Sequence, residues 1–182
     1  MRVRLRSEAG FGLIELLMAM VILNIGILAI VAAFNAGIVT LNRASRISTA
    51  AALGDKTMET YRALTYGCIY ENTPPTADST YTSDAAYDGA WGITAGTSCS
   101  TAPPAASSSL TGADRKSYRV DAYVAWSCSV GSPSGSVSNP QCASASSGRP
   151  VKKVTIVVRD GARLTARPYA RVASTFDPST GG

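Results

Sequence analysis

The stretch that decides the fold is Gly10-Phe11-Gly12-Leu13-Ile14-Glu15-Leu16-Leu17-Met18-Ala19-Met20-Val21-Ile22, which opens the longest apolar run of the chain. From Leu16 to Phe34, Asn24 is the only residue with a polar side chain. A helix of that length spans about 28 Å at ~1.5 Å per residue, close to the ~30 Å hydrocarbon core of a bilayer. The sequence therefore predicts a membrane-spanning helix.

Glu15 does not fit an ordinary membrane anchor. An unpaired carboxylate within a spanning helix costs a few kcal/mol, on the order of 3. Glu15 either reaches the membrane surface from its place near the helix end, or it has a positive partner. Cleavage after Gly10 would supply such a partner, the α-amino group of Phe11.

Three arginines precede the apolar run, and they keep that end of the chain in the cytoplasm by the positive-inside rule (Arg2, Arg4 and Arg6). Gly10, Phe11 and Glu15, placed between this basic leader and the spanning run, resemble the class III signal of type IV prepilins and pseudopilins. The resemblance implies cleavage after Gly10 by a prepilin peptidase, N-methylation of Phe11, and pairing of Glu15 with the Phe11 amine of a neighbouring subunit. It also implies an inner-membrane assembly platform and other pilin subunits as partners. Gly12 departs from the family, which usually has Thr or Ser there, but it keeps the residue small.

A conventional secretory signal is the competing interpretation, with Val31-Ala32-Ala33 as a small-residue cleavage site before Phe34. Three features oppose it. The apolar run is longer than a usual signal core, it holds a carboxylate near its start, and the helical pattern continues past Ala33.

Beyond the apolar run, apolar or small residues recur mostly at steps of three or four, as in an amphipathic helix: Ile38, Leu41, Ala44, Ile47, Ala51, Met58, Tyr61 and Leu64. No proline interrupts residues 11–73, so one helix of about 50 residues or more is predicted, ending at Tyr66 before Gly67. We expect a leader at 1–10, a transmembrane and assembly half of the helix at 11–39, an amphipathic half at 40–66, and an extracytoplasmic body at 67–182.

The body is predicted to hold a small antiparallel sheet. Tyr118–Trp126 and Lys153–Arg159 alternate with a period of two, and a third strand at Arg163–Ala173 contains Pro168 and is placed at an edge. Aromatic residues between 66 and 91 are expected to pin an irregular segment onto the helix and sheet.

A long helix on such a sheet is an α+β fold that resembles pilins, and the strand pair resembles that of PilV-type minor pilins. Major pilins of the better-known subclass usually carry a proline near the middle of the apolar segment, where this chain has Ala32, which favours a minor pilin or a pseudopilin.

The four cysteines predict two disulfides formed outside the cytoplasm. Cys68 and Cys99 would close one loop, and Cys128 and Cys142 would staple the loop between the two main strands. None of the spacings suits a metal site. The chain has no histidine, and nothing resembles a nucleophile with its base, so we expect neither an enzyme nor a cofactor.

Net charge is +5, too weak by itself to indicate nucleic-acid binding. Basic residues gather near the C-terminus, among them Lys152, Lys153 and Arg163; a solvated or inter-subunit face is favoured over a DNA-binding surface. The sequence thus predicts a structural subunit of a type IV pilus, held in the inner membrane and then carried into an extracytoplasmic filament. The alternative is a pseudopilin of a type II secretion or DNA-uptake machine.

Overall fold

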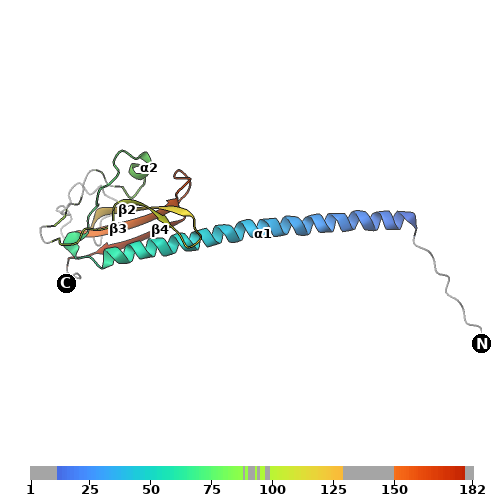
Figure 1. Cartoon of the computed structure of the whole chain (residues 1–182), viewed down its shortest axis with the longest axis horizontal. Coiled ribbons are helices and arrows are strands. Elements are labelled where there is room, and N and C mark those ends of the chain that lie inside the picture. The colour runs from blue at the N-terminus through green and yellow to red at the C-terminus, as the bar shows by residue number, and fades with distance from the viewer. Residues whose placement is uncertain are drawn as a thin grey trace, which may run out of the picture. The chain divides into compact units, whose positions relative to one another are not determined.

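A computed structural model describes residues 12–87, 89, 93, 95–96, 99–128 and 150–178 (Figure 1). The chain divides into two compact units, residues 1–44 and 45–182. The elements, in chain order, are α1 (Leu13–Arg62), the 3-10 helix η1 (Tyr66–Cys68), α2 (Ser79–Thr82), β1 (Ser107–Thr111), β2 (Ser117–Cys128), β3 (Pro150–Asp160) and β4 (Ala170–Phe176).

The helix α1 contains 50 residues, as the uninterrupted pattern predicts. Its threonines fit the helix because their hydroxyls donate to the carbonyl four residues earlier, as in Thr57 to Leu53 (2.9 Å). The helix ends at Arg62 and not at the expected Tyr66. Leu64 packs against the core of the body and Thr65 is extended, which turns the chain away from the helix axis.

The four strands form one antiparallel sheet in the order β1-β2-β3-β4, so the α+β prediction is confirmed. Each of the two predicted central strands is longer than expected by one to three residues at its ends. Their pairing runs from Tyr118 opposite Asp160 to Cys128 opposite Pro150. β4 lies at an edge, as Pro168 suggested, but it begins only at Ala170.

Residues 161–169 form a loop where the third strand was predicted to begin. The Asp160 carboxylate accepts a hydrogen bond from the Ala162 amide (2.9 Å), which turns the chain directly after β3. Pro168 has no amide hydrogen, and the backbone rejoins β3 only where Tyr169 donates to Val158 O (2.9 Å).

The sheet is covered on both faces within the unit 45–182 (Figure 1). One face packs its alternating apolar residues against the second half of α1, and this core includes Ala50, Met58, Tyr61, Val120, Val124, Val154, Ile156 and Val158. On the other face the Tyr81 ring of α2 stacks on Tyr123 at 4.4 Å, and its hydroxyl donates to Ala122 O (2.8 Å). Tyr81 therefore pins the irregular segment to the sheet, as expected of these aromatic residues.

Gly54 allows the closest approach of α1 to the sheet. It is buried, and a Cβ atom there would lie 3.3 Å from Val172 Cγ2 and 3.5 Å from Val158 Cγ2. A side chain larger than methyl would therefore have to displace β3 or β4.

We predict that Gly54→Leu lowers the free energy of unfolding of the body by about 1–3 kcal/mol, because it overpacks this contact. Thermal unfolding followed by near-ultraviolet circular dichroism measures the change. Gly37→Leu is the matched control, since nothing lies within 4 Å of a Cβ atom at Gly37. Equal stability of the two variants would contradict the described contact.

Candidate functional site

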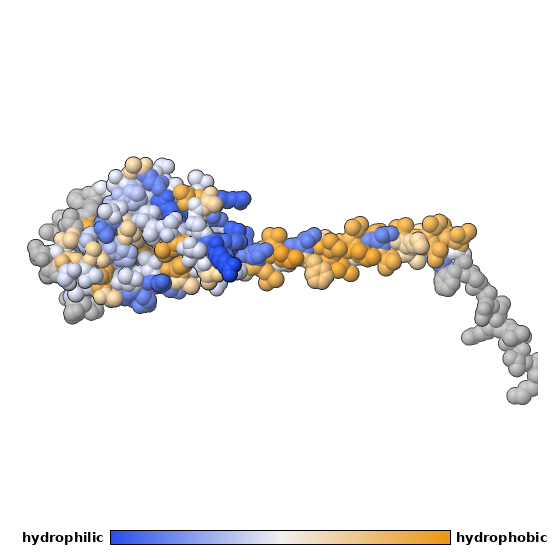
Figure 2. Space-filling model, viewed as in Figure 1, coloured by the Kyte–Doolittle hydropathy of each residue, from blue (hydrophilic) through white to orange (hydrophobic). Residues whose placement is uncertain are grey.

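The first part of α1 exposes its large apolar side chains. Every Leu, Ile, Val, Met and Phe from Leu13 to Leu41 is at least half exposed, and the most apolar 18-residue window of the helix has a mean hydropathy of 2.7 (Figure 2). Soluble monomers rarely expose apolar patches beyond a few hundred Å². By length and composition this helix can cross a membrane.

Glu15 lies in the first turn of α1, where its amide donates to Gly12 O (2.9 Å). Its side chain is exposed between Ile14 and Leu16, which are 71% and 53% exposed. A carboxylate near a helix N-terminus is stabilised by the helix dipole, by ~0.3–1 kcal/mol, which leaves most of the cost of membrane insertion uncompensated. Gly10 and Phe11 lie outside the described residues.

In a comparison with known families, residues 5–31 match the prokaryotic N-terminal methylation motif. This segment is similar to the N-terminus of type IV pilins and pseudopilins. No curated protein and no solved structure matches the chain.

The methylation motif indicates the role of the exposed apolar helix. Pilin-like proteins are structural subunits and not enzymes, and the motif implies processing by a prepilin peptidase and assembly with other pilins. Together with the apolar helix, it is consistent with a membrane-anchored protein. Among the described residues, no three His, Cys, Asp or Glu side chains gather as a metal ion would require.

A disulfide joins Cys68 of η1 to Cys99, 31 residues later, with Cα atoms 4.9 Å apart. It is the first of the two predicted bridges, and closing a loop of this length stabilises the fold by about 3–4 kcal/mol in the chain-entropy treatment. The second predicted bridge involves the Cys128 side chain and Cys142, which lie outside the described residues.

The three predicted basic-surface residues do not form one cluster. Lys152 is buried at 4% exposure, and its Nζ donates to Tyr66 O and Ile69 O, both at 2.8 Å. Its ammonium also lies 4.5 Å from the Tyr66 ring centre, and burial lowers the pKa of Lys152 to about 8. Lys152 therefore fixes η1 to β3 and is not available to an exposed surface. Lys153 and Arg163 are exposed, but they line different pockets.

A buried ion-pair network fastens α2 and its flanks to the sheet of the pilin-like body. Its centre is Asp121 on β2, which is fully buried and accepts from Arg119 Nε (2.7 Å), Arg159 Nη1 (2.6 Å) and Ser107 Oγ (2.7 Å). All donors to this carboxylate come from strands β1, β2 and β3. A carboxylate in this position is stable only because both oxygens are paired.

The network continues outward to the segment around α2. Arg119 pairs with Asp78, which caps α2, and Arg159 pairs with Asp84 just after it. Asp84 also accepts from Arg171 of β4 (2.8 Å). Burial acts to raise the pKa of Asp84, but the Ala86 amide and the two arginines outweigh it and hold that pKa below its usual value.

Sequence reasoning missed this network and the role of Lys152. One signal was available: Arg119 and Asp121 are two residues apart on a predicted strand and so share a face. Their partners Asp78 and Asp84 come from a segment without a periodic pattern, so the sequence did not indicate which acidic residues would meet them.

We predict that Asp121→Asn lowers the free energy of unfolding by about 3–5 kcal/mol, because it leaves Arg119 and Arg159 buried with less opposing charge. Urea unfolding measures the loss. Asp55→Asn on the exposed face of α1 makes the same chemical change and should shift stability by no more than ~0.5 kcal/mol. A loss of similar size in both variants would contradict the role of the network.

Acid should weaken the body through Asp84. The pKa of Asp84 is lower in the folded protein than in the unfolded chain. The stability that Asp84 contributes is therefore present above its pKa in the unfolded chain, and it is lost as the pH falls through its pKa in the folded protein. We predict that stability falls with pH below about 4 and that Asp84→Asn reduces this slope. Thermal midpoints measured from pH 7 to pH 2 test both; an unchanged slope in the variant would show that Asp84 does not carry the effect.

Proposed function

We propose that the chain is a minor pilin of a type IV pilus, assembled into the filament through α1 after removal of residues 1–10. The observation that carries this proposal is the exposed apolar surface of α1 from Leu13 to Leu41. Lipid would cover that surface in the precursor state, and the equivalent helices of neighbouring subunits would cover it in the filament. The basic leader supports an orientation with the N-terminus in the cytoplasm and residues 67–182 outside it.

Glu15 is the proposed assembly residue, and Gly10 and Phe11 are the proposed processing residues. In the apolar surroundings of packed helices, the carboxylate of Glu15 would pair with the Phe11 amine of an adjacent subunit. Such a pair forms only when the subunit leaves lipid for the filament, which gives assembly a direction.

Ala32 supports a minor pilin over a major pilin, because major pilins of the better-known subclass usually carry a proline at that position. A pseudopilin of a type II secretion or DNA-uptake machine would share the leader, Glu15 and the apolar helix. The two differ in their partners, so co-purification with a surface pilus supports the first, and co-purification with a periplasmic secretion complex supports the second.

We predict that Glu15→Ala leaves membrane insertion and folding of the body unchanged and lowers incorporation into sheared filaments at least tenfold. A charged hydrogen bond contributes ~1.5–3 kcal/mol, and ~1.4 kcal/mol corresponds to a factor of ten. Immunoblots of membrane and filament fractions measure the ratio.

Two variants make the test specific. Glu59→Ala removes an exposed carboxylate from the same helix and should incorporate normally. Gly10→Val should instead leave the full-length precursor in the membrane, because cleavage is blocked. Normal incorporation of Glu15→Ala would count against the pairing mechanism, whatever the two controls show.

A further inference from the structure

Three asparagines lie along one face of α1 within the unit 1–44: Asn24, Asn35 and Asn42. Their spacings are 11 and 7 residues. At ~100° per residue, each step returns to within about 20° of the same direction, and the whole interval is about five turns. All three side chains are exposed, and Figure 2 shows hydrophilic groups recurring along one edge of the otherwise apolar helix. We call this side of α1 the asparagine face.

Asn24 is the asparagine that lipid suits least. It lies eight residues after Leu16, about 12 Å into the ~28 Å apolar run that ends at Phe34. Its Nδ2 donates to Met20 O (3.0 Å), which uses one of the two amide hydrogens. Within the described residues this carboxamide forms no other hydrogen bond, so its Oδ1 and its second hydrogen remain for a partner. Hydrocarbon offers neither a donor nor an acceptor.

The asparagine face is not the side of the helix that carries Glu15. Glu15 precedes Asn24 by nine residues, which places it about 180° away around the helix axis. The apolar side chains within about 40° of the asparagine face are all at least half exposed: Leu17, Met20, Leu28, Val31 and Ile38. A second helix can therefore pack on this face without covering Glu15.

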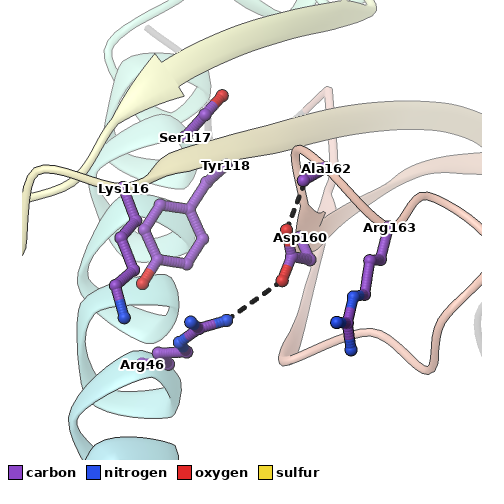
Figure 3. A pocket seen from close by; sticks show the side chains of 7 residues that line it. All are labelled: Arg46, Lys116, Ser117, Tyr118, Asp160, Ala162 and Arg163. Atoms are coloured by element: carbon purple, nitrogen blue, oxygen red, sulfur yellow. Dashed lines mark hydrogen bonds and ion pairs between the residues drawn. The ribbon is translucent and has the colours of Figure 1, made fainter.

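The body engages α1 from Arg46 onward. In the unit 45–182, Arg46 donates to the Asp160 carboxylate (3.1 Å; Figure 3) and to the Tyr169 hydroxyl (3.0 Å). Further along the helix, Ala50, Gly54, Met58 and Tyr61 are buried. This use of the second half leaves the part of α1 from 13 to 42 for a partner helix.

A second copy of this chain meets the requirements of the asparagine face. A carboxamide both donates and accepts, so one asparagine is complementary to another at the same depth. Copies inserted with the same basic leader cross the membrane in the same direction, so their helices are parallel. In register, all three asparagines lie opposite their equivalents, whereas a shift of 7, 11 or 18 residues aligns only one pair. The unequal spacing therefore selects one register, as a buried asparagine does in coiled coils.

We propose that two copies of the chain associate in the membrane through the asparagine face, as a parallel, in-register pair of α1 helices. Asn24 contributes most, because no water competes for its hydrogen bonds, while Asn35 and Asn42 help to fix the register. A filament grows by subunits offset along its axis, so this pair is a contact separate from the filament contact of Glu15. The proposal rests on the membrane anchoring within the proposed function and not on pilus membership.

Disulfide cross-linking tests the proposal, in membranes of cells that make the full chain but no other pilin and no prepilin peptidase. Val31→Cys places a thiol about 20° from the line of Asn24, and Ala33→Cys, the matched control, places one about 180° from it. The unsubstituted chain gives the background from the native cysteines. We expect at least fivefold more cross-linked dimer from Val31→Cys than from Ala33→Cys.

The role of the carboxamide is tested by adding Asn24→Leu to Val31→Cys. We expect the cross-linked fraction to fall about three- to tenfold, the usual effect of a hydrogen-bonded pair between membrane helices. Thr40→Val is the control for loss of a polar group. It removes a hydroxyl that is already bonded to Ala36 O and lies about 160° from Asn24, so the cross-link should be unchanged.

Three results would overturn the proposal. Equal cross-linking from Val31→Cys and Ala33→Cys would show contact without a preferred face. Cross-linking from Ala33→Cys alone would assign self-association to the side of the helix that carries Glu15. A Val31→Cys cross-link that Asn24→Leu does not weaken would show that the carboxamides do not hold the pair. Glu15→Ala should leave the Val31→Cys cross-link unchanged, so this proposal and the filament proposal can fail independently.

Discussion

The exposed apolar side chains of α1 from Leu13 to Leu41 need an apolar surrounding, and the remaining described features are arranged around that need. Burial of one such side chain is worth ~1.5–3 kcal/mol, so water is excluded as their working environment. Lipid would satisfy them in the proposed anchored state, and other apolar helices would replace lipid without a large change in free energy. Glu15 is the one ionisable side chain between Leu13 and Leu41. A carboxylate here favours any state in which it gains a cation.

The second half of the same helix has the opposite requirement. It must be fixed to a body that stays folded outside the lipid, and it is fixed by close packing at Gly54 and by the apolar face of the sheet. The other face is held by a different chemistry. There the network around Asp121 secures the polar segment around α2. Lys152 and the Cys68–Cys99 bridge hold η1, with Lys152 on the same face of the sheet as the core against α1. One helix thus serves as an interaction surface at one end and as a structural support at the other.

The sequence predicted those features that depend on local periodicity. The long helix and the two central strands follow from patterns of apolar residues, and the edge position of the last strand follows from Pro168. The even count of cysteines predicted disulfides, and the structure shows that Cys68 pairs with Cys99. β1 was missed because Ser-Ser-Ser-Leu-Thr has a single apolar residue and gains its place only by pairing with β2. Lys152 was misplaced because a charged residue in a strand usually points to solvent. The backbone carbonyls of Tyr66 and Ile69, both of which accept from its Nζ, make the interior favourable for it.

The central claim is that the exposed helix belongs to a subunit cut and modified at its N-terminus, between Gly10 and Phe11. Mass spectrometry of the N-terminal peptide of the mature protein, purified from membranes, tests this most directly. The account predicts a peptide that begins at Phe11 and carries a methyl group on its amine. A mature chain that begins at Phe34, as a conventional secretory signal would give, or one that still begins at Met1, would contradict it.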